Sequence, residues 1–404
     1  MRTRLGFPVW AGLLLAGLFA TPGPSLRADD LRVTVDGTES GFRRERLVEW
    51  PVPDALRDKP LIVRAGDVEV PSQLAPDHSR LWWRSTVGEG IAPRLEFEIA
   101  AGKPPSGAVQ AEASRTESAV EIQVAGRPVI AYHTAPRLPE QVNPVYRRSG
   151  HIHPLTTPGG LVVTDEFPED HLHQHALFFA WVNTQFQGRH IDFWNQPARE
   201  GTVEHSELVS TDSGPLWAGF HARLSHSEKR GDEPAKPVLR EDWTVAALRL
   251  GDLHVVDLES RQRAVSGDSL EILKYHYGGF GVRGAASWGK ECEFLTSEGA
   301  DRLKGNHTHC RWVRLTGRVD GKECGLAVLS DPKNFRAPQA VRLHPSMPYF
   351  AFSPCVDGGF SIGNDADYVS RYRVLAFDGT VSAERLETLW NDFSRPLIAV
   401  EKSQ

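Results

Sequence analysis

Beyond its first thirty residues, the 404-residue sequence contains no long hydrophobic run. A membrane-spanning helix needs about 20 consecutive apolar residues, and no stretch after Ala28 approaches that length. Long runs of Lys and Arg are also missing, and the 46 basic residues are outnumbered by 52 acidic ones, giving a formal net charge of −6. A protein that binds nucleic acid needs a basic surface to neutralise phosphates. We therefore expect no integral membrane association and no nucleic-acid partner.

Sequence motifs of several enzyme classes are absent as well. The sequence has no Walker loop and no GxSxG nucleophile elbow. The glycines of the segment 274–284 (KYHYGGFGVRG) are not followed by a helical pattern, so they do not form a dinucleotide fingerprint. These absences argue against a nucleotide-binding enzyme and against a serine hydrolase of the elbow type.

Cysteine is scarce, with four residues at Cys292, Cys310, Cys324 and Cys355. Their spacing is not typical of a zinc site, but an even count permits two disulfides in an oxidising compartment. If Asp320 and Gly321 form a two-residue hairpin turn, Cys324 lies opposite Gly317 and cannot pair with Cys310 across that hairpin. The other pairings, and four free buried thiols, remain open.

The N-terminal residues have the pattern of an export signal. Arg2 and Arg4 precede an apolar stretch from 7 to 20, and Pro22 ends it. That stretch is too short for a spanning helix. We predict a signal peptide at residues 1–28 and an exported protein, periplasmic or extracellular.

Apolar and polar residues alternate with a period of two through most of the chain, which predicts β-strands. Hairpins are indicated at 120–132 and at 312–329. Helical spacing is persuasive only near the C-terminus, where Ser382 is a suitable N-cap. The apolar positions there are Leu386, Leu389, Trp390 and Phe393, with Pro396 after the helix end. We expect an all-β sandwich or supersandwich with a small N-terminal β region and one C-terminal helix.

A chain of this length exceeds one ordinary hydrophobic core, which predicts two parts. The segment 101–107 (AGKPPSG) is typical of a linker. We therefore divide the chain after the signal into an N-terminal β region at 29–110 and a main domain at 115–400.

Histidines gather between 151 and 175. If Asp170 to Trp181 is one strand, His171, His173 and His175 share a face, and the apolar half (ALFFAW) fixes the strand in a core. His151 and His153 likewise share a face if their segment is extended. A polar cluster beside an apolar strand is energetically costly without a use, which favours a functional site.

Imidazole can exchange protons near neutral pH, and it can also bind a transition metal. The first role makes His173 or His175 a general acid or base, with Asp170 as its partner. The alternative is a metal-dependent hydrolase or oxygenase with His171, His173 and His175 as ligands, and nearby carboxylates such as Glu166 could complete either site. If the histidines exchange protons and bind no metal, no cofactor is expected.

Two further groups could bind a ligand. In the segment 274–284, Tyr277 precedes the glycines and Arg283 follows them; an Arg side chain offers a planar donor fork for a carboxylate or vicinal hydroxyls. Among the 11 Trp residues, Trp194 is the best candidate for stacking on a sugar ring, because polar residues surround it.

Several segments together resemble a known family. They are HPLTTPGG with TDEFPEDHLHQHALFFAW, then IDFW, YGGFGVRG, PKNFRAP and SRYRVLAFDG, which span about residues 115–400. They are similar to the PmoA-like family of unknown function, which itself resembles galactose-mutarotase-like supersandwich proteins. The methane oxygenase label of that family does not fit this chain, because no stretch after Ala28 could span a bilayer.

The resemblance implies a concave β-sheet that holds a sugar. The expected binding residues are His153, His171, Arg283, Tyr277 and Trp194. The leading hypothesis is an exported carbohydrate-active or carbohydrate-binding protein, enzymatic in the manner of a hydrolase, lyase or epimerase. The alternatives are the metal-dependent enzyme and a non-catalytic envelope binding module.

Overall fold

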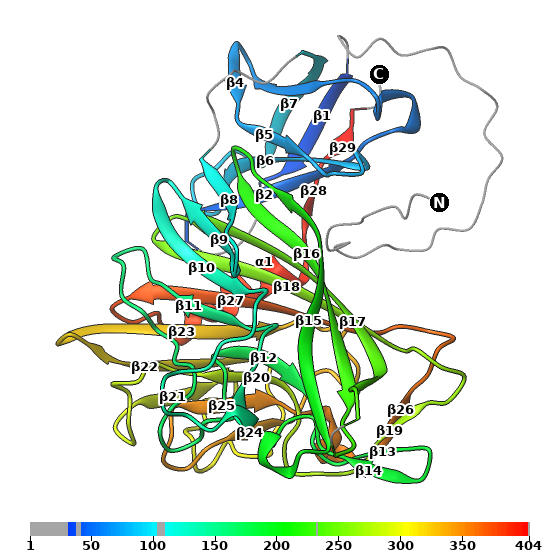
Figure 1. Ribbon diagram of the computed structural model, residues 1–404. Helices are drawn as coiled ribbons and strands as arrows, with labels where there is room; N and C mark the ends of the chain where they lie inside the picture. Colours follow the sequence, from blue (N-terminus) through cyan, green and yellow to red (C-terminus); the bar gives the residue numbers. More distant parts are fainter. Residues whose placement is uncertain (1–30, 38–41, 103–109, 232, 403–404) are drawn as a thin grey trace. The chain divides into compact units, whose positions relative to one another are not determined.

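The computed structural model describes residues 31–37, 42–102, 110–231 and 233–402 (Figure 1). The predicted signal peptide and residues 103–107 of the predicted linker lie outside these ranges. The chain forms two compact units. The first comprises the described residues up to Ala111, Ser213–Trp217 and those from Asn391 onward, and the second comprises Glu112–Asp212 and Ala218–Trp390.

The first unit contains two sheets around one core. The five-stranded sheet has the order β29 (Val400–Glu401), β1 (Leu31–Asp36), β7 (Arg94–Ala101), β3 (Leu61–Ala65) and β4 (Val68–Val70). The four-stranded sheet has the order β28 (Leu397–Ile398), β2 (Arg44–Pro51), β6 (Arg80–Val87) and β5 (Ser72–Leu74). Both sheets bury apolar side chains, among them Val33, Trp50 and Trp83, in a shared core. The unit therefore includes the C-terminal strands β28 and β29 as well as the N-terminal strands.

The second unit is built on two eight-stranded sheets. One has the order β24 (Val341–Leu343), β25 (Tyr349–Phe352), β20 (Gly279–Arg283), β12 (Leu177–Ala180), β11 (Ile152–Leu155), β10 (Arg127–His133), β9 (Ala119–Val124) and β8 (Ala111–Arg115). The other has the order β15 (Gly201–Asp212), β16 (Trp217–Glu228), β17 (Lys236–Leu250), β18 (Leu253–Ala264), β27 (Tyr368–Asp378), β23 (Lys322–Ser330), β22 (Trp312–Val319) and β21 (Glu293–Thr296). A small third sheet has the order β14 (Arg189–Ile191), β13 (Thr184–Phe186), β19 (Leu270–Ile272) and β26 (Phe360–Ile362).

Aromatic side chains join the two large sheets face to face. Tyr132 of β10 stacks on Phe220 of β16 with ring centroids 4.6 Å apart. Phe280 of β20 stacks on Tyr372 of β27 at the same distance. Burying such rings between two sheets supplies much of the hydrophobic stabilisation of a sandwich. The expected all-β sandwich is confirmed.

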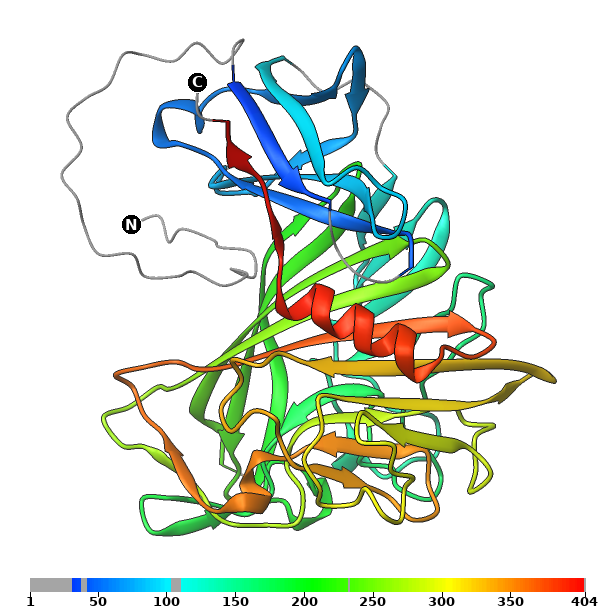
Figure 2. The ribbon, with the colours of Figure 1, turned by 180° about the vertical axis from the view of Figure 1, so that it is seen from behind.

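Elements with strong local signals form where the sequence predicts them. The hairpin of β22 and β23 turns at Asp320 and Gly321, both with positive φ, and Cys324 lies opposite Gly317. Helix α1 (Ala383–Ser394) begins after Ser382, whose Oγ accepts a hydrogen bond from the Arg385 amide at 3.2 Å. Figure 2 shows α1 against the strands of the second large sheet, where Trp390 Nε1 donates to the Ser330 carbonyl of β23 at 2.8 Å.

The four cysteines are all buried and free, so neither disulfide forms. Within the described part of the chain, no helix has the length and apolar character needed to cross a membrane.

Candidate functional site

The histidine stretch is a turn, and the expected strand from Asp170 to Trp181 is wrong in its first half. The strand β12 begins only at Leu177. Before it, the amide of His171 donates to the Pro168 carbonyl and the amide of Gln174 donates to the His171 carbonyl, both at 2.9 Å. Ala176 has φ 58°, a left-handed conformation that a strand does not contain. His171, His173 and His175 therefore do not share a strand face.

Arg283 of β20 holds this turn in place. Its guanidinium donates to Gln174 Oε1 at 2.9 Å and pairs with Asp170 Oδ1 at 2.9 Å. The Arg283 side chain is only 6% exposed. The structure thus brings Asp170 and Arg283 together, and we call the contacts of Arg283 with Asp170 and Gln174 the Arg283 clamp. In the sequence, His171 and His173 lie between the two residues that Arg283 binds.

A pocket of about 180 Å³, the outer histidine pocket, opens beside the clamped turn. It is lined by His171, His173, Gln174, Trp194, His276, Tyr277, Arg342, His344, Met347 and Tyr349. The turn, the loop after β14, the segment before β20 and the β24–β25 hairpin each contribute residues. The ring centroids of His171 and His173 are 5.4 Å apart, and those of His171 and His344 are 6.0 Å apart. Four of the expected site residues, His171, His173, Tyr277 and Trp194, meet here.

Two imidazoles of this pocket, those of His173 and His344, are uncharged at neutral pH. Burial, reinforced by the neighbouring His171 and by Arg148, lowers the pKa of His173 to about 4. Burial and the charge of Arg342 lower the pKa of His344 to about 4. A neutral imidazole has one N–H donor and one nitrogen acceptor, so it can serve both sides of a hydroxyl group.

Aromatic side chains make the floor of the pocket. Trp194 is 1% exposed, with ring centroids 4.5 Å from Phe178 and 5.3 Å from Tyr277. Gly281 lies beneath it, and a Cβ there would meet Trp194 at 2.7 Å. Within the segment 274–284, Gly281 therefore allows the Trp194 ring to pack against the backbone of β20. Because Trp194 is so deeply buried, little of its ring is open to a ligand.

Deeper in the same unit lies a second group, the inner histidine cluster of His133, His151 and Glu166. His151 Nε2 donates to Glu166 Oε2 at 2.7 Å, and His133 Nε2 lies 3.9 Å from the same oxygen. Burial lowers the pKa of His133 to about 4 and that of His151 to about 3. His153 lies nearby, with Nδ1 3.1 Å from Thr164 Oγ1 and its pKa lowered by burial to about 4.

His175 belongs to this interior and does not line the outer pocket. Its side chain is fully buried, and Nε2 donates to Gln196 Oε1 at 3.0 Å. Its ring centroid is 5.3 Å from that of His151. Among the described residues, only the inner histidine cluster brings three or more His, Cys, Asp or Glu side chains close enough together to hold a metal ion. The alternative metal set of His171, His173 and His175 is therefore not assembled.

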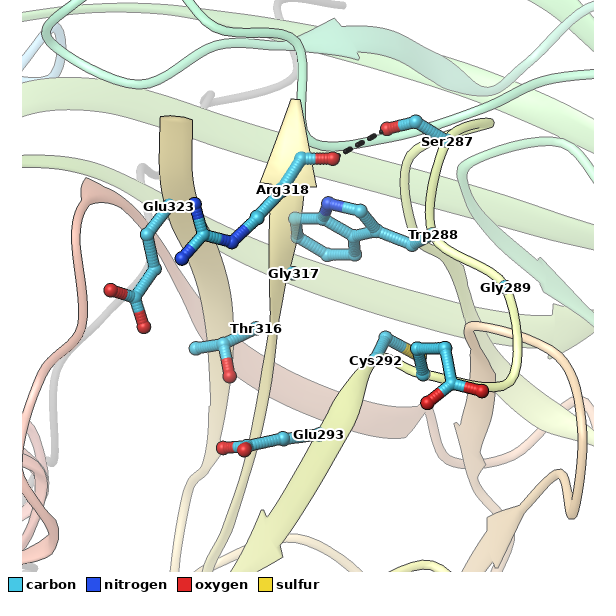
Figure 3. Close-up of a pocket in the computed structure, with 10 residues that line it drawn as sticks. Ser287, Trp288, Gly289, Cys292, Glu293, Thr316, Gly317, Arg318 and Glu323 are labelled. Carbon is cyan, nitrogen blue, oxygen red and sulfur yellow. Dashed lines mark hydrogen bonds between the residues drawn. The ribbon is translucent and has the colours of Figure 1, made fainter. Parts of the chain in front are cut away.

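A larger pocket of about 360 Å³ lies elsewhere in the second unit (Figure 3). Trp288, with Thr316 and Gly317 of β22, forms part of its wall, and a Cβ on Gly317 would meet the Trp288 ring at 2.5 Å. Three carboxylates line it, from Glu291, Glu293 and Glu323. No imidazole lines it, so this pocket lacks the neutral proton-exchanging groups of the outer histidine pocket.

Sequence reasoning missed His133, Arg342, His344, Met347 and Tyr349. His344 and Tyr349 lie about 170 residues from the histidine turn, and β-sheet pairing brings them to it. A conspicuous signal was present at 344–349 (HPSMPY), where His and aromatic residues flank two prolines.

Comparison with known proteins establishes the family. Residues 119–391 match the model of a family of unknown function, DUF6807, and the chain belongs to that family. The more specific PmoA-like label stays a prediction. No curated protein matches the sequence.

Solved structures give only distant likenesses. The heparan sulfate lyase HepC from Pedobacter heparinus is 12% identical, with a TM-score of 0.36 over 70% of this chain and 38% of its own. An alpha-mannosidase from Enterococcus faecalis V583 is 10% identical, with a TM-score of 0.36 over 92% of this chain and 46% of its own. This chain spans less than half the length of either protein. At such TM-scores the likenesses carry no argument about activity.

Proposed function

We propose that the protein binds an acidic sugar in the outer histidine pocket and exchanges a proton with it through His173. The observation that carries this proposal is the lining itself, which combines neutral imidazoles, one permanent cation and aromatic walls in a space of about 180 Å³. Drug-sized ligands occupy pockets of roughly 300–1,000 Å³. The smaller pocket favours a single sugar ring, with any further residues of a glycan outside it.

The charge of the lining favours an anionic ligand. Arg342 is the only described residue of the lining with a permanent charge, and no Asp or Glu is among them. The imidazoles of His173 and His344 are neutral. A carboxylate on the ligand would pair with the planar guanidinium of Arg342 and compensate its charge.

The same lining favours proton abstraction over hydrolysis. Most glycoside hydrolases use two carboxylates about 5–10 Å apart, and this pocket offers none among its described residues. A neutral imidazole such as His173 can remove the proton from the carbon next to a sugar carboxylate. Burial raises the pKa of Tyr277 to about 12, so its hydroxyl acts as a donor. Among the expected reaction types, this favours lyase or epimerase chemistry.

The experiment is a binding and turnover screen with uronic acids and uronate-containing glycans, each beside its neutral counterpart. We expect the acidic member of each pair to bind more tightly. Arg342→Ala should weaken that binding about 10- to 100-fold, because a charged hydrogen bond contributes about 1.5–3 kcal/mol. Arg240→Ala is the matched control, since Arg240 is exposed and pairs only with Asp242 in the described structure.

Turnover separates the catalytic role of His173 from binding alone. His173→Gln should lower turnover by about 10²–10⁴-fold with a smaller effect on affinity. Binding that is saturable but yields no product from any glycan would identify the protein as a non-catalytic module. Equal binding of acidic and neutral sugars, unaffected by Arg342→Ala, would refute the proposal.

We also propose that this binding takes place outside the cytoplasm, on the basis of the sequence pattern at residues 1–28. Cell fractionation of the tagged protein, with and without those residues, tests the location. Equal recovery of both forms in the cytoplasm would contradict it.

A further inference from the structure

The inner histidine cluster contains a buried nitrogen with nothing to bind. His133 is 6% exposed, and its Nε2 has no hydrogen-bond partner. That atom lies 3.9 Å from Glu166 Oε2, too far for a hydrogen bond. Buried polar groups are nearly always paired, because leaving one unpaired loses the free energy of its hydration. A missing partner at this point is therefore a specific feature to explain.

The atoms around it form the donor set of a transition-metal site. His133, His151 and Glu166 each offer one ligand atom, and these atoms lie within 4.8 Å of one another. Two imidazoles with one carboxylate bind zinc in catalytic sites and iron in non-haem enzymes. The set comes from three separate places in the fold: the end of β10, the residue before β11 and the segment before the histidine turn.

Neighbouring residues orient these ligands as they do around bound metals. The second oxygen of Glu166, Oε1, pairs with the Arg137 guanidinium at 2.6 Å, which fixes the carboxylate plane. The backbone holds both histidines, since the His133 amide donates to the His151 carbonyl at 3.0 Å. Ligand carboxylates and imidazoles usually have such outer partners. Arg137 is 48% exposed, so its side chain lies between the cluster and solvent, where an ion would enter.

Hydrogen bonds without a metal ion account for only part of the geometry of the inner histidine cluster. A hydrogen-bonded row of His151, Glu166 and Arg137 satisfies the carboxylate and His151 Nε2 without any ion. It leaves His133 Nε2 unpaired although the nitrogen lies within the cluster. One cation between the three ligand atoms would satisfy all of them together.

We propose that His133 Nε2, His151 Nε2 and Glu166 Oε2 bind one divalent transition-metal ion of the zinc type. This site is separate from the outer histidine pocket, and the proposal does not depend on the sugar. Three protein ligands leave a tetrahedral ion one position for water or another small ligand. The His151–Glu166 hydrogen bond would be exchanged for two bonds to the ion, and the single ring proton of the neutral His151 would move from Nε2 to Nδ1, which has no hydrogen-bond partner.

The test is a titration of the chelator-treated full chain with Co²⁺, followed by visible absorption and elemental analysis, and repeated with Zn²⁺. We expect one equivalent to bind, with the intense absorption of Co²⁺ in a low-coordination site. His133→Ala and Glu166→Gln should each weaken binding at least about 100-fold. His190→Ala is the matched control, because His190 also bonds to a carboxylate, Glu200 at 2.7 Å, but is exposed and lies outside the cluster.

The variants are interpretable even if one of them folds poorly. Zn²⁺ should raise the melting temperature of the wild-type chain and of His190→Ala, but not that of Glu166→Gln, whose amide is nearly isosteric with the carboxylate. Less than about a tenth of an equivalent of either ion in the wild type would overturn the proposal. So would a Co²⁺ spectrum that survives His133→Ala and Glu166→Gln but is lost in His171→Ala, since the ion would then belong to the outer pocket.

Discussion

At the scale of single residues, burial beside His171 and two arginines keeps the imidazole of His173 neutral. Burial lowers the pKa of His173 to about 4; His171, Arg148 and Arg283 act in the same direction, and Asp170 acts against them. A free histidine titrates near 6.5. At pH 7 His173 is therefore almost entirely in the neutral form, which has a free nitrogen that can accept a proton, and its low pKa makes it a weaker base than a free imidazole.

The same shift makes folding stability depend on pH. Between about pH 6.5 and pH 4 the unfolded chain binds a proton at His173 that the folded chain does not, so the free energy of unfolding falls as the pH falls. His173→Gln should lose less stability than the wild type over this window, by about 1–2 kcal/mol after allowance for partial exposure. Urea denaturation at pH 7 and pH 4.5 measures the difference. Parallel losses in the two proteins would contradict a depressed pKa.

At the scale of elements, local sequence patterns correctly predicted the hairpins and the helix, whose formation depends on interactions between residues close in the sequence. Two hairpins and helix α1 depend on turn residues, an N-cap and side-chain spacing within a dozen positions. The Asp320–Gly321 turn and the Ser382 cap both form as expected. These elements needed no information from elsewhere in the chain.

The histidine turn was mispredicted for a reason that lies outside its own sequence. Its residues alternate as a strand would, but Arg283 from another strand binds Asp170 and Gln174 and holds the backbone in a turn. Tertiary contacts of this kind override local preference. Pairing between distant strands also hid His344, which reaches the outer pocket because β25 pairs with β20. His133 reaches the inner cluster through the pairing of β10 with the next strand, β11.

The Arg283 clamp gives a prediction at this scale. Arg283→Lys keeps the positive charge but cannot bridge Asp170 and Gln174 with one planar group. Acidic-sugar binding should weaken about 10-fold, and the NMR signals of the His171 and His173 imidazoles should shift. Arg240→Lys is the control that should change neither. Unchanged imidazole signals in Arg283→Lys would show that the turn holds its shape without the clamp.

At the scale of the whole molecule, the first unit joins the two ends of the described chain. Strand β28 pairs in parallel with β2, where Leu397 lies beside Val48, and β29 pairs with β1. Leu397 is buried in the core of the first unit, while the next residue, Ile398, is exposed. Strand β28 therefore contributes Leu397 to this unit's hydrophobic core, whereas β29 extends one of its sheets.

Leu397→Ala should destabilise the first unit by about 2–4 kcal/mol, because it removes buried methyl groups and leaves a cavity. Ile398→Ala, at the neighbouring exposed position, should change stability by less than about 1 kcal/mol. Hydrogen exchange measures the effect element by element. Faster exchange in β1 and β2 with unchanged exchange in β18 is the expected pattern, and equal acceleration in both units would contradict it.

The pairing of residues near 398 with residues near 48 also sets an order of events during synthesis. Strands β1 and β2 are made early and can pair with β7 and β6, but each lacks its second neighbour, β29 or β28, until residues 397–401 have been made. The second unit contains its own strands and can fold earlier, whereas the first must wait with unpaired strand edges. A stop codon just before β28 would therefore leave an edge of both β1 and β2 exposed to aggregation and proteolysis, although every strand of the two eight-stranded sheets would already have been made.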